Sequence, residues 1–410
     1  MTNLTPPTAD IRKLSARQFN LLVLGLLTVA VGQSFVFAIL PPLGRDVGFN
    51  EMQINAMIST SAMIFSLSTP WWGGFSDRVG RKPVLVFGLA AYAVGNFIFA
   101  LVLSAGMSGV LVGMPLFAIA LLARCTQAIT MSASNPAAAA YTADFSSPKE
   151  RTKAMARLGT ASSLGMIFGP IIAGALAGLG LLFPLFVATG LAALAALIVA
   201  IRLPTDRNPH REHRAHRKLK LTDSRLSMYL LCSFGAFVGF SGIQQTLAFR
   251  LQDMFALSGA ETAQYTGVAM MTTAFFTLLM QLTVTQRFQG PPVILIRIGL
   301  ALMAVGALLI SIAGGYALIV VALGIVGAGL GLATPSLAAA ASLAVEPEEQ
   351  GATAGLVTAC PAAGFVVGPV FFGWLYTLDP TVSAAGAGLM LAIVAATGWL
   401  GLKRPAQSVS

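Results

Sequence analysis

The stretch GGFSDRVGRKP at residues 73–83 places one acidic and three basic residues between two strongly apolar segments. Gly80 permits a tight turn, and Gly73 permits the close approach of a neighbouring helix. Asp77 needs a positive partner or a helix N-terminus, because an isolated charge at the edge of an apolar layer is costly. The stretch therefore predicts a charged turn that joins two membrane helices.

The composition of the whole chain supports this setting. Its 410 residues are 56% hydrophobic and only 10% charged, and the mean hydropathy is +0.80. A soluble domain carries about 25% charged residues. Apolar runs of about 20 residues span a bilayer as helices, and these runs are too long and too uniformly apolar for barrel strands. The predicted class is an all-α membrane protein.

The apolar runs predict twelve membrane-spanning helices. They lie at residues 19–43, 53–73, 84–104, 109–133, 154–178, 182–203, 226–249, 264–286, 293–313, 316–341, 353–376 and 384–402. Two of the joins, at 103–109 and 178–182, are short glycine-rich breaks. An even number of spans places both termini on one side of the membrane.

Lysine and arginine gather on one side of this topology. The side that holds the termini carries 22 basic residues, whereas the other carries only Arg45 and Arg250, and Arg124 lies inside a span. Cytoplasmic loops show such an excess, so we expect cytoplasmic termini. The net charge of +10 then reflects topology and attraction to anionic membrane lipid, not nucleic-acid binding.

The two halves of the chain repeat one another. Three prolines recur at a constant offset of 199 residues: Pro136, Pro148 and Pro170 correspond to Pro335, Pro347 and Pro369. In the same register, Gly165, Gly169 and Gly174 correspond to Gly364, Gly368 and Gly373. We therefore predict two pseudo-symmetric six-helix bundles, 1–203 and 226–410, joined by a basic cytoplasmic linker, 204–225. Such repeats are typical of transporters with a binding site at the midplane.

The charged turn resembles the signature loop of the major facilitator superfamily. The matching residues are Gly73, Asp77, Arg78, Gly80, Arg81 and Lys82. The resemblance covers essentially the whole chain, and it implies that Asp77 closes onto the second half near the start of the eleventh span in the outward-open state. The corresponding turn of the second half, TQRFQGPPV at 285–293, lacks the acid. If the bases served only to set topology, Asp77 and the glycines would have no role.

Two further patterns resemble the proton-coupled drug antiporters of this superfamily. In LLARCTQAIT of the fourth span, Arg124 and Gln127 match, while Ala128 replaces the usual glycine. The fifth span carries the antiporter pattern with Gly165, Gly169, Pro170 and Gly174. Its physical role is close helix packing, with a bend at the proline. The end of the first span, ILPPLGRDVG, is also similar to this branch.

Arg124 is the most informative single residue. A charge near the middle of a span costs at least about 2.5–3.5 kcal/mol, so Arg124 faces either a watery cavity or a packing partner. Neither Asp nor Glu lies deep in any predicted span, which favours neutral or anionic substrates. The candidate cavity residues are Gln33, Phe37, Arg124, Gln127, Met131, Asn135, Phe240, Gln244 and Gln245. Asn96 is set aside, because the resemblance places the third span at the periphery.

The remaining motifs exclude other classes of protein. The three cysteines lie inside spans, and His210, His213 and His216 lie in the basic linker, where a solvated face is favoured over a metal site. No catalytic or phosphate-binding motif is present, so we expect neither an enzyme nor a cofactor.

We therefore expect a monomeric exporter of small amphipathic compounds, driven by protons, in the bacterial inner membrane. The alternative is a permease for one metabolite, such as a siderophore or an organic acid.

Overall fold

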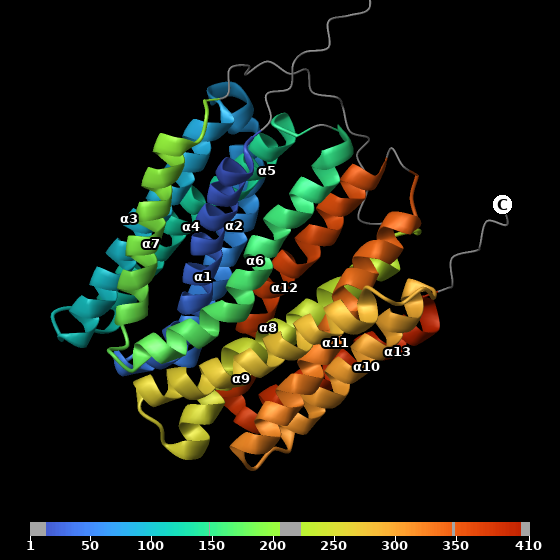
Figure 1. The fold of residues 1–410 in the computed structure, drawn as a ribbon. Coiled ribbons are helices and arrows are strands. Elements are labelled where there is room, and N and C mark those ends of the chain that lie inside the picture. Colours follow the sequence, from blue (N-terminus) through green and yellow to red (C-terminus); the bar gives the residue numbers. More distant parts are fainter. Residues whose placement is uncertain (1–13, 147, 206–222, 347–348, 403–410) are drawn as a thin grey trace, which may run out of the picture.

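The computed structural model describes residues 14–146, 148–205, 223–346 and 349–402 (Figure 1). These residues form helices and connecting turns and include no strand. The all-helical prediction is therefore confirmed. Most of the predicted linker, with His210, His213 and His216, lies outside the described residues.

The helices follow one another with short connections. The first half holds α1 (Ala16–Asp46), α2 (Glu51–Val79), α3 (Arg81–Met107), α4 (Gly113–Met131), α5 (Ser134–Asp144), α6 (Pro148–Ala177) and α7 (Phe183–Arg202). The second half holds α8 (Ser227–Phe255), α9 (Gly259–Met280), the π-helical turn η1 (Gln281–Thr285), α10 (Pro292–Ser311), α11 (Tyr316–Leu343), α12 (Gln350–Leu378) and α13 (Pro380–Gly401). Because α5 continues α4 and η1 continues α9, the order is consistent with the twelve predicted spans.

Local sequence explains where several helices begin and end. Ser15, Asn50 and Ser258 each form a reciprocal capping box with the residue three positions later, which satisfies backbone N–H groups at the starts of α1, α2 and α9. Gly80 separates α2 from α3 with a φ of +108°, a backbone conformation that residues other than glycine rarely adopt.

Ten helical segments among the described residues are long and apolar enough to cross a membrane. α2 and α6 are equally long but do not meet that criterion, and α6 contributes only the short apolar stretch Phe168–Ala177. Both helices face the other half of the protein, since α2 packs against α12 and α6 against α9. A helix that faces protein does not need the uniformly apolar surface that lipid requires.

The two halves form two helix bundles that lie side by side (Figure 1). The blue-to-green helices make up one bundle and the yellow-to-red helices the other. Besides the α2–α12 and α6–α9 pairs, α1 contacts α8 and α9 across the boundary. The elements that meet between the bundles are therefore the ones that position any central site.

The repeated glycines occupy equivalent packing positions in the two bundles. A Cβ atom added to Gly165 would meet the backbone of α1 at Ala30 and Val31, and one added to Gly364 would meet α8 at Phe237 and Val238. In each bundle, a glycine lets the fifth helix of the repeat contact the first helix backbone to backbone.

The third pair of repeated glycines lies between the bundles. Gly174 of α6 faces Ala263 and Gln264 of α9, and Gly373 of α12 faces Asn55 of α2. The same position of the repeat therefore provides a close helix contact at both the α6–α9 and the α12–α2 crossings.

Substitution at Gly364 tests the close helix contact. We expect Gly364→Ala to destabilise the protein by about 1–3 kcal/mol, because overpacked atoms force backbone shifts; the new Cβ would lie 2.7 Å from Phe237 Cβ and 2.9 Å from Val238 N. Gly355→Ala is the matched control, since it lies on the same helix with nothing within 4 Å. The apparent melting temperature of the detergent-purified variants reports the difference. An equal effect of both substitutions would contradict the packing role.

Candidate functional site

Arg124 lies inside the first bundle and is fully buried. Its Nη1 donates to Gln127 Oε1 at 2.6 Å, and its Nη2 donates to Gln33 Oε1 at 3.0 Å. The guanidinium also lies 5.8 Å from the centroid of the Phe99 ring. The arginine is thus held by side-chain amides of α1 and α4 and, in this conformation, has no exposed surface of its own.

A chain of polar groups continues from Gln127 across the bundle. Gln127 Nε2 lies 3.5 Å from Asn96 Oδ1 on α3. Asn96 Nδ2 in turn donates to Leu185 O at 2.8 Å and to Thr189 Oγ1 at 3.0 Å on α7. Asn96, which the sequence analysis set aside, therefore belongs to the Arg124 network. An asparagine in an otherwise apolar span could have indicated that Asn96 has a polar partner inside the bundle.

The other predicted cavity residues of α1, α4 and α5 separate from this network. Phe37 is partly buried and stacks on Phe365 of α12 with 5.8 Å between ring centroids. Met131 packs in an apolar cluster of the first bundle, and Asn135 is exposed. Helical spacing placed Met131 and Asn135 on the face of Arg124. Met131 is buried on that face of α4, whereas Asn135, which follows the turn between α4 and α5, is exposed.

The second bundle contributes a separate hollow of about 170 Å³. Phe240 and Gln244 of α8 line it together with Pro170 of α6. Gln245 does not line it; the side chain is fully buried, and neither amide atom has a hydrogen-bond partner. The structure thus brings Phe240, Gln244 and Pro170 together and leaves Gln245 apart.

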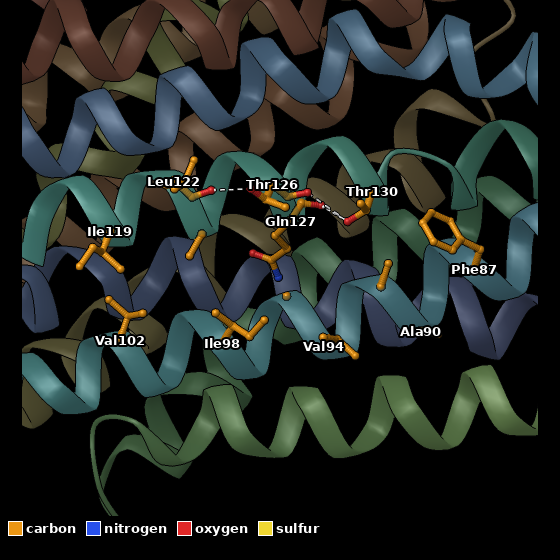
Figure 2. A pocket seen from close by; sticks show the side chains of 13 residues that line it. Phe87, Ala90, Val94, Ile98, Val102, Ile119, Leu122, Thr126, Gln127 and Thr130 are labelled. Atoms are coloured by element: carbon orange, nitrogen blue, oxygen red, sulfur yellow. Dashed lines mark hydrogen bonds between the residues drawn. The ribbon is translucent and has the colours of Figure 1, made fainter.

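A larger hollow, of about 640 Å³, lies between α3 and α4 (Figure 2). Val94 and Leu122 line it and are strongly exposed, so it opens on the surface of the first bundle, where a membrane protein faces hydrocarbon. Gln127 reaches this hollow from the side of the Arg124 network, while the hydroxyls of Thr126 and Thr130 donate to carbonyls of their own helix.

The charged turn lies at one end of the bundles, hereafter the Asp77 end. Asp77 forms an ion pair with Arg81, which also approaches Asp144 Oδ2 at 3.4 Å and donates to Ser76 Oγ at 2.9 Å. All these partners belong to the first half. A Cβ atom at Gly73 would lie 3.8 Å from Pro136, an ordinary contact, so this conformation does not require glycine there.

A second charged group lies at the Asp77 end of the other bundle. Arg225 donates to Asp223 at 2.8 Å and to Glu349, directly before α12, at 2.9 Å. The hydrogen bonds from Arg225 hold the pKa of the Asp223 carboxyl below its usual value. The single positive charge of Arg225 is therefore shared between two carboxylates of its own half.

The opposite end, hereafter the Arg45 end, joins the two halves by an ion-pair cluster. Arg45 of α1 bonds Glu51 of α2 at 2.5 Å and Asp253 of α8 at 2.6 Å. Asp253 also accepts from the Tyr376 hydroxyl of α12 at 2.5 Å, and the Arg45 guanidinium lies 4.8 Å from the Phe249 ring centroid. Four helices from both bundles therefore meet at one arginine.

The sequence did not predict this cluster. The rarity of bases on that side of the predicted topology, where only Arg45 and Arg250 occur, could have indicated it. The structure separates these two residues: Arg250 donates to the Ser311 and Ala313 carbonyls at the end of α10, within its own half.

No group of His, Cys, Asp and Glu side chains suited to a metal ion occurs among the described residues. The described carboxylates lie near the two ends of the bundles. The groups available for binding between those ends are therefore amides, hydroxyls, aromatic rings and the guanidinium of Arg124.

The fold and these sites define an integral membrane protein with two helical bundles and polar groups between their ends. The chain belongs to the Major Facilitator Superfamily, which matches it over residues 22–360. It is therefore a transporter and not an enzyme.

Known proteins resemble most of the chain. It is 27% identical over 382 residues to Multidrug resistance protein 1 of Bacillus subtilis, covering 91% of this chain and 93% of that protein. Quinolone resistance protein NorA of Staphylococcus aureus is 22% identical over 161 residues, 39% of this chain and 38% of that protein. A bacterial homologue of the human lysosomal transporter Spinster, in an inward-facing and unoccupied conformation, matches with a TM-score of 0.77 at 16% identity over 96% of this chain and 97% of that one. The structural likeness shows the fold.

Substitution of Arg124 tests the polar network. We expect Arg124→Lys to lower transport about tenfold, because an ammonium cannot reproduce the planar fork that binds Gln33 and Gln127 together. Arg124→Ala should lose more, since it leaves both amides without their donor. Arg297→Lys is the control, because that arginine donates only to carbonyls at the end of α13. Transport by both Arg124 variants at the rate of the unmodified protein, with unchanged pH dependence, would make Arg124 a packing residue.

Proposed function

We propose that this transporter exports small amphipathic compounds, drugs or metabolites, in exchange for protons. The observation that carries this proposal is the similarity to Multidrug resistance protein 1 of Bacillus subtilis over 91% of the chain. The antiporter pattern in α6 and the Arg124–Gln127 pair in α4 point in the same direction. We place the protein in a bacterial inner membrane with both termini in the cytoplasm, in accord with the distribution of its basic residues.

Alternating access supplies the mechanism of this proposal. The Arg45 cluster ties α1 and α2 to α8 and α12 at one end, while Asp77 pairs within its own half at the other end. With the Arg45 end outside, this arrangement is an inward-facing state. In the outward-facing state the Arg45 cluster separates, and Asp77 approaches the start of α12.

The second candidate is a permease for one dedicated metabolite. It is favoured by the absence of a carboxylate from the described interior and by the positive charge of Arg124. A site with this field suits neutral or anionic compounds better than the lipophilic cations that an acidic site would attract. The two candidates differ in breadth, since an exporter of drugs accepts many compounds and a permease accepts one.

Transport in proteoliposomes tests the proposed function directly. We expect a pH gradient to drive accumulation of several chemically unrelated amphipathic dyes against their own gradient, because proton movement supplies the energy. A protonophore should abolish the accumulation. Reversal of the imposed gradient should reverse the direction of transport. Lack of gradient-dependent accumulation across cationic, neutral and anionic dyes would overturn the proposal, and accumulation of one compound alone would favour the permease.

Substitutions at the two charged ends should shift the conformational equilibrium in opposite directions. We expect Asp253→Asn to favour the outward-facing state about tenfold, because it weakens charge-assisted bonds that contribute about 1.5–3 kcal/mol. Asp77→Asn should favour the inward-facing state, since it removes the charge that closes the Asp77 end. Spin labels at Val110→Cys and Ile312→Cys, in a chain without native cysteines, report the distance between the bundles at the Arg45 end.

Glu261→Gln is the matched control for this measurement. Glu261 lies at the same end, but it bonds only Ser258 of its own half. The label distances of this variant should equal those of the unmodified protein. An unchanged distance distribution in Asp253→Asn would exclude the Arg45 cluster as the contact that holds this end closed.

A further inference from the structure

The hollow of the second bundle is lined by apolar and uncharged polar side chains. It is bounded by α8, α9 and α11 of the second half and by α6 of the first half. Its lining includes Pro170, Phe240, Gln244, Thr273, Gln281 and Thr334. Its volume of about 170 Å³ lies below the 300–1,000 Å³ of a complete drug-sized pocket, so it accommodates one ring with its substituent.

Two polar atoms at this hollow are buried and unpaired. Gln244 Oε1 and Thr273 Oγ1 have no hydrogen-bond partner among the protein groups, and Thr273 is only 3% exposed. Nearby Thr277 differs, because its hydroxyl already donates to Thr273 O at 2.8 Å and Gly327 O at 2.9 Å. A buried polar group without a partner is costly, and a ligand that supplies a hydrogen-bonding group would remove this cost.

Aromatic rings form the wall next to these atoms. Phe237 and Phe240 line the hollow, and both contact Phe365, with ring centroids 6.4 Å and 6.5 Å from its centroid. Phe37 of the first half stacks on Phe365. The rings therefore form an apolar cluster that reaches from one bundle to the other, and Phe237 and Phe240 present it to the hollow.

No charged side chain lines the hollow. On the helices that bound it, the described charges lie near the ends: Glu261 is in the first turn of α9, and Arg250 and Asp253 are in the last turns of α8. α11 carries no charged residue. A charged ligand group would lose its hydration here without gaining a counter-ion.

The helix that carries most of the polar lining is also irregular at this place. α9 changes to the π-helical turn η1 at Gln281, which itself lines the hollow. Thr285 of η1 donates to Gly331 O of α11 at 3.0 Å, so the irregular turn is held against the neighbouring helix. Such π-helical insertions are rare and occur frequently at functional sites.

We infer that this hollow is a subsite for an uncharged aromatic ring bearing a hydrogen-bond donor, such as a hydroxyl or an amide N–H. The ring lies against Phe240, and its donor reaches Thr273 Oγ1, with Gln244 Oε1 as a second acceptor at the same hollow. The inference rests on the proposed function in that the ring belongs to a transported compound. It assigns to the second half the recognition of neutral groups, separately from Arg124 in the first half.

Binding of a matched pair of compounds tests the subsite. 4-Ethylphenol and 4-ethylanisole each carry one ring, have similar shapes and are uncharged at pH 7, but only the first donates a hydrogen bond. Equilibrium binding of the radiolabelled compounds to the full-length protein in nanodiscs should show about 5–10-fold tighter binding of the phenol, the factor expected for one hydrogen bond. Equal affinities would overturn the inference.

Two threonines of α9 supply the matched variants. Thr273→Val should weaken binding of the phenol about 5–10-fold and leave the ether within about twofold, because only the phenol loses a partner. Thr266→Val is the control, since Thr266 is equally buried and also unpaired but does not line the hollow. Equal losses in both variants, or equal losses for both compounds in Thr273→Val, would contradict the subsite.

A charge placed in the hollow provides a second, independent test. Gln244→Glu keeps the size of the side chain and adds the carboxylate that the interior lacks. This variant should gain at least about tenfold in affinity for phenyltrimethylammonium, a cation with a single ring, because the hollow then supplies its counter-ion. Unchanged affinity for the cation would place Gln244 away from bound ligand and would overturn the inference.

Failure of the subsite and failure of the proposed function remain distinguishable. Binding is measured without a gradient, and transport is measured with one. Gradient-driven transport of dyes combined with equal binding of phenol and ether would leave the exporter standing and reject the subsite. Selective, Thr273-dependent binding of the phenol without any gradient-driven transport would support the subsite and reject the exporter.

Discussion

Backbone-to-backbone contact at glycine is the interaction on which the rest of this structure depends. Lipid provides no hydrophobic drive for helices to associate, so close packing has to replace it. Gly165 seats α6 against α1, and Gly364 seats α12 against α8. Gly174 and Gly373 then bring α6 to α9 and α12 to α2, so that the same repeat also builds the boundary between the halves.

The interior left by this packing holds polar side chains in both halves. Arg124 is held by Gln33 and Gln127, and Asn96 extends the hydrogen bonds toward α7. In the second half, Gln244 and Thr273 carry buried atoms without a protein partner. The first half also has buried atoms without a protein partner, among them Arg124 Nε and Tyr92 Oη, but those of Gln244 and Thr273 belong to residues that line a hollow together with aromatic rings. This difference arises although the two halves repeat in sequence.

Apart from Arg124, the charged side chains of the described helices lie toward the helix ends, where they distinguish the two sides of the boundary. At the Arg45 end one arginine bonds carboxylates from both halves. At the Asp77 end the ion pairs of Asp77 and of Arg225 each stay within one half. A transporter that alternates between two states requires this kind of asymmetry, because contacts that close both ends together would prevent movement.

Sequence alone determined the helical class, the approximate spans, the repeat and the family, because long apolar runs, the excess of bases and the signature turn are local properties of the chain. It also singled out Arg124 and Gln127, since a charge in a span is rare. The tertiary structure decided their partners: it added Asn96, left Asn135 exposed, and joined Arg45 to Asp253, 208 residues further along the chain. Periodicity gives the face of a helix but not the neighbour that the face meets, and that neighbour depends on how fourteen helical segments pack together.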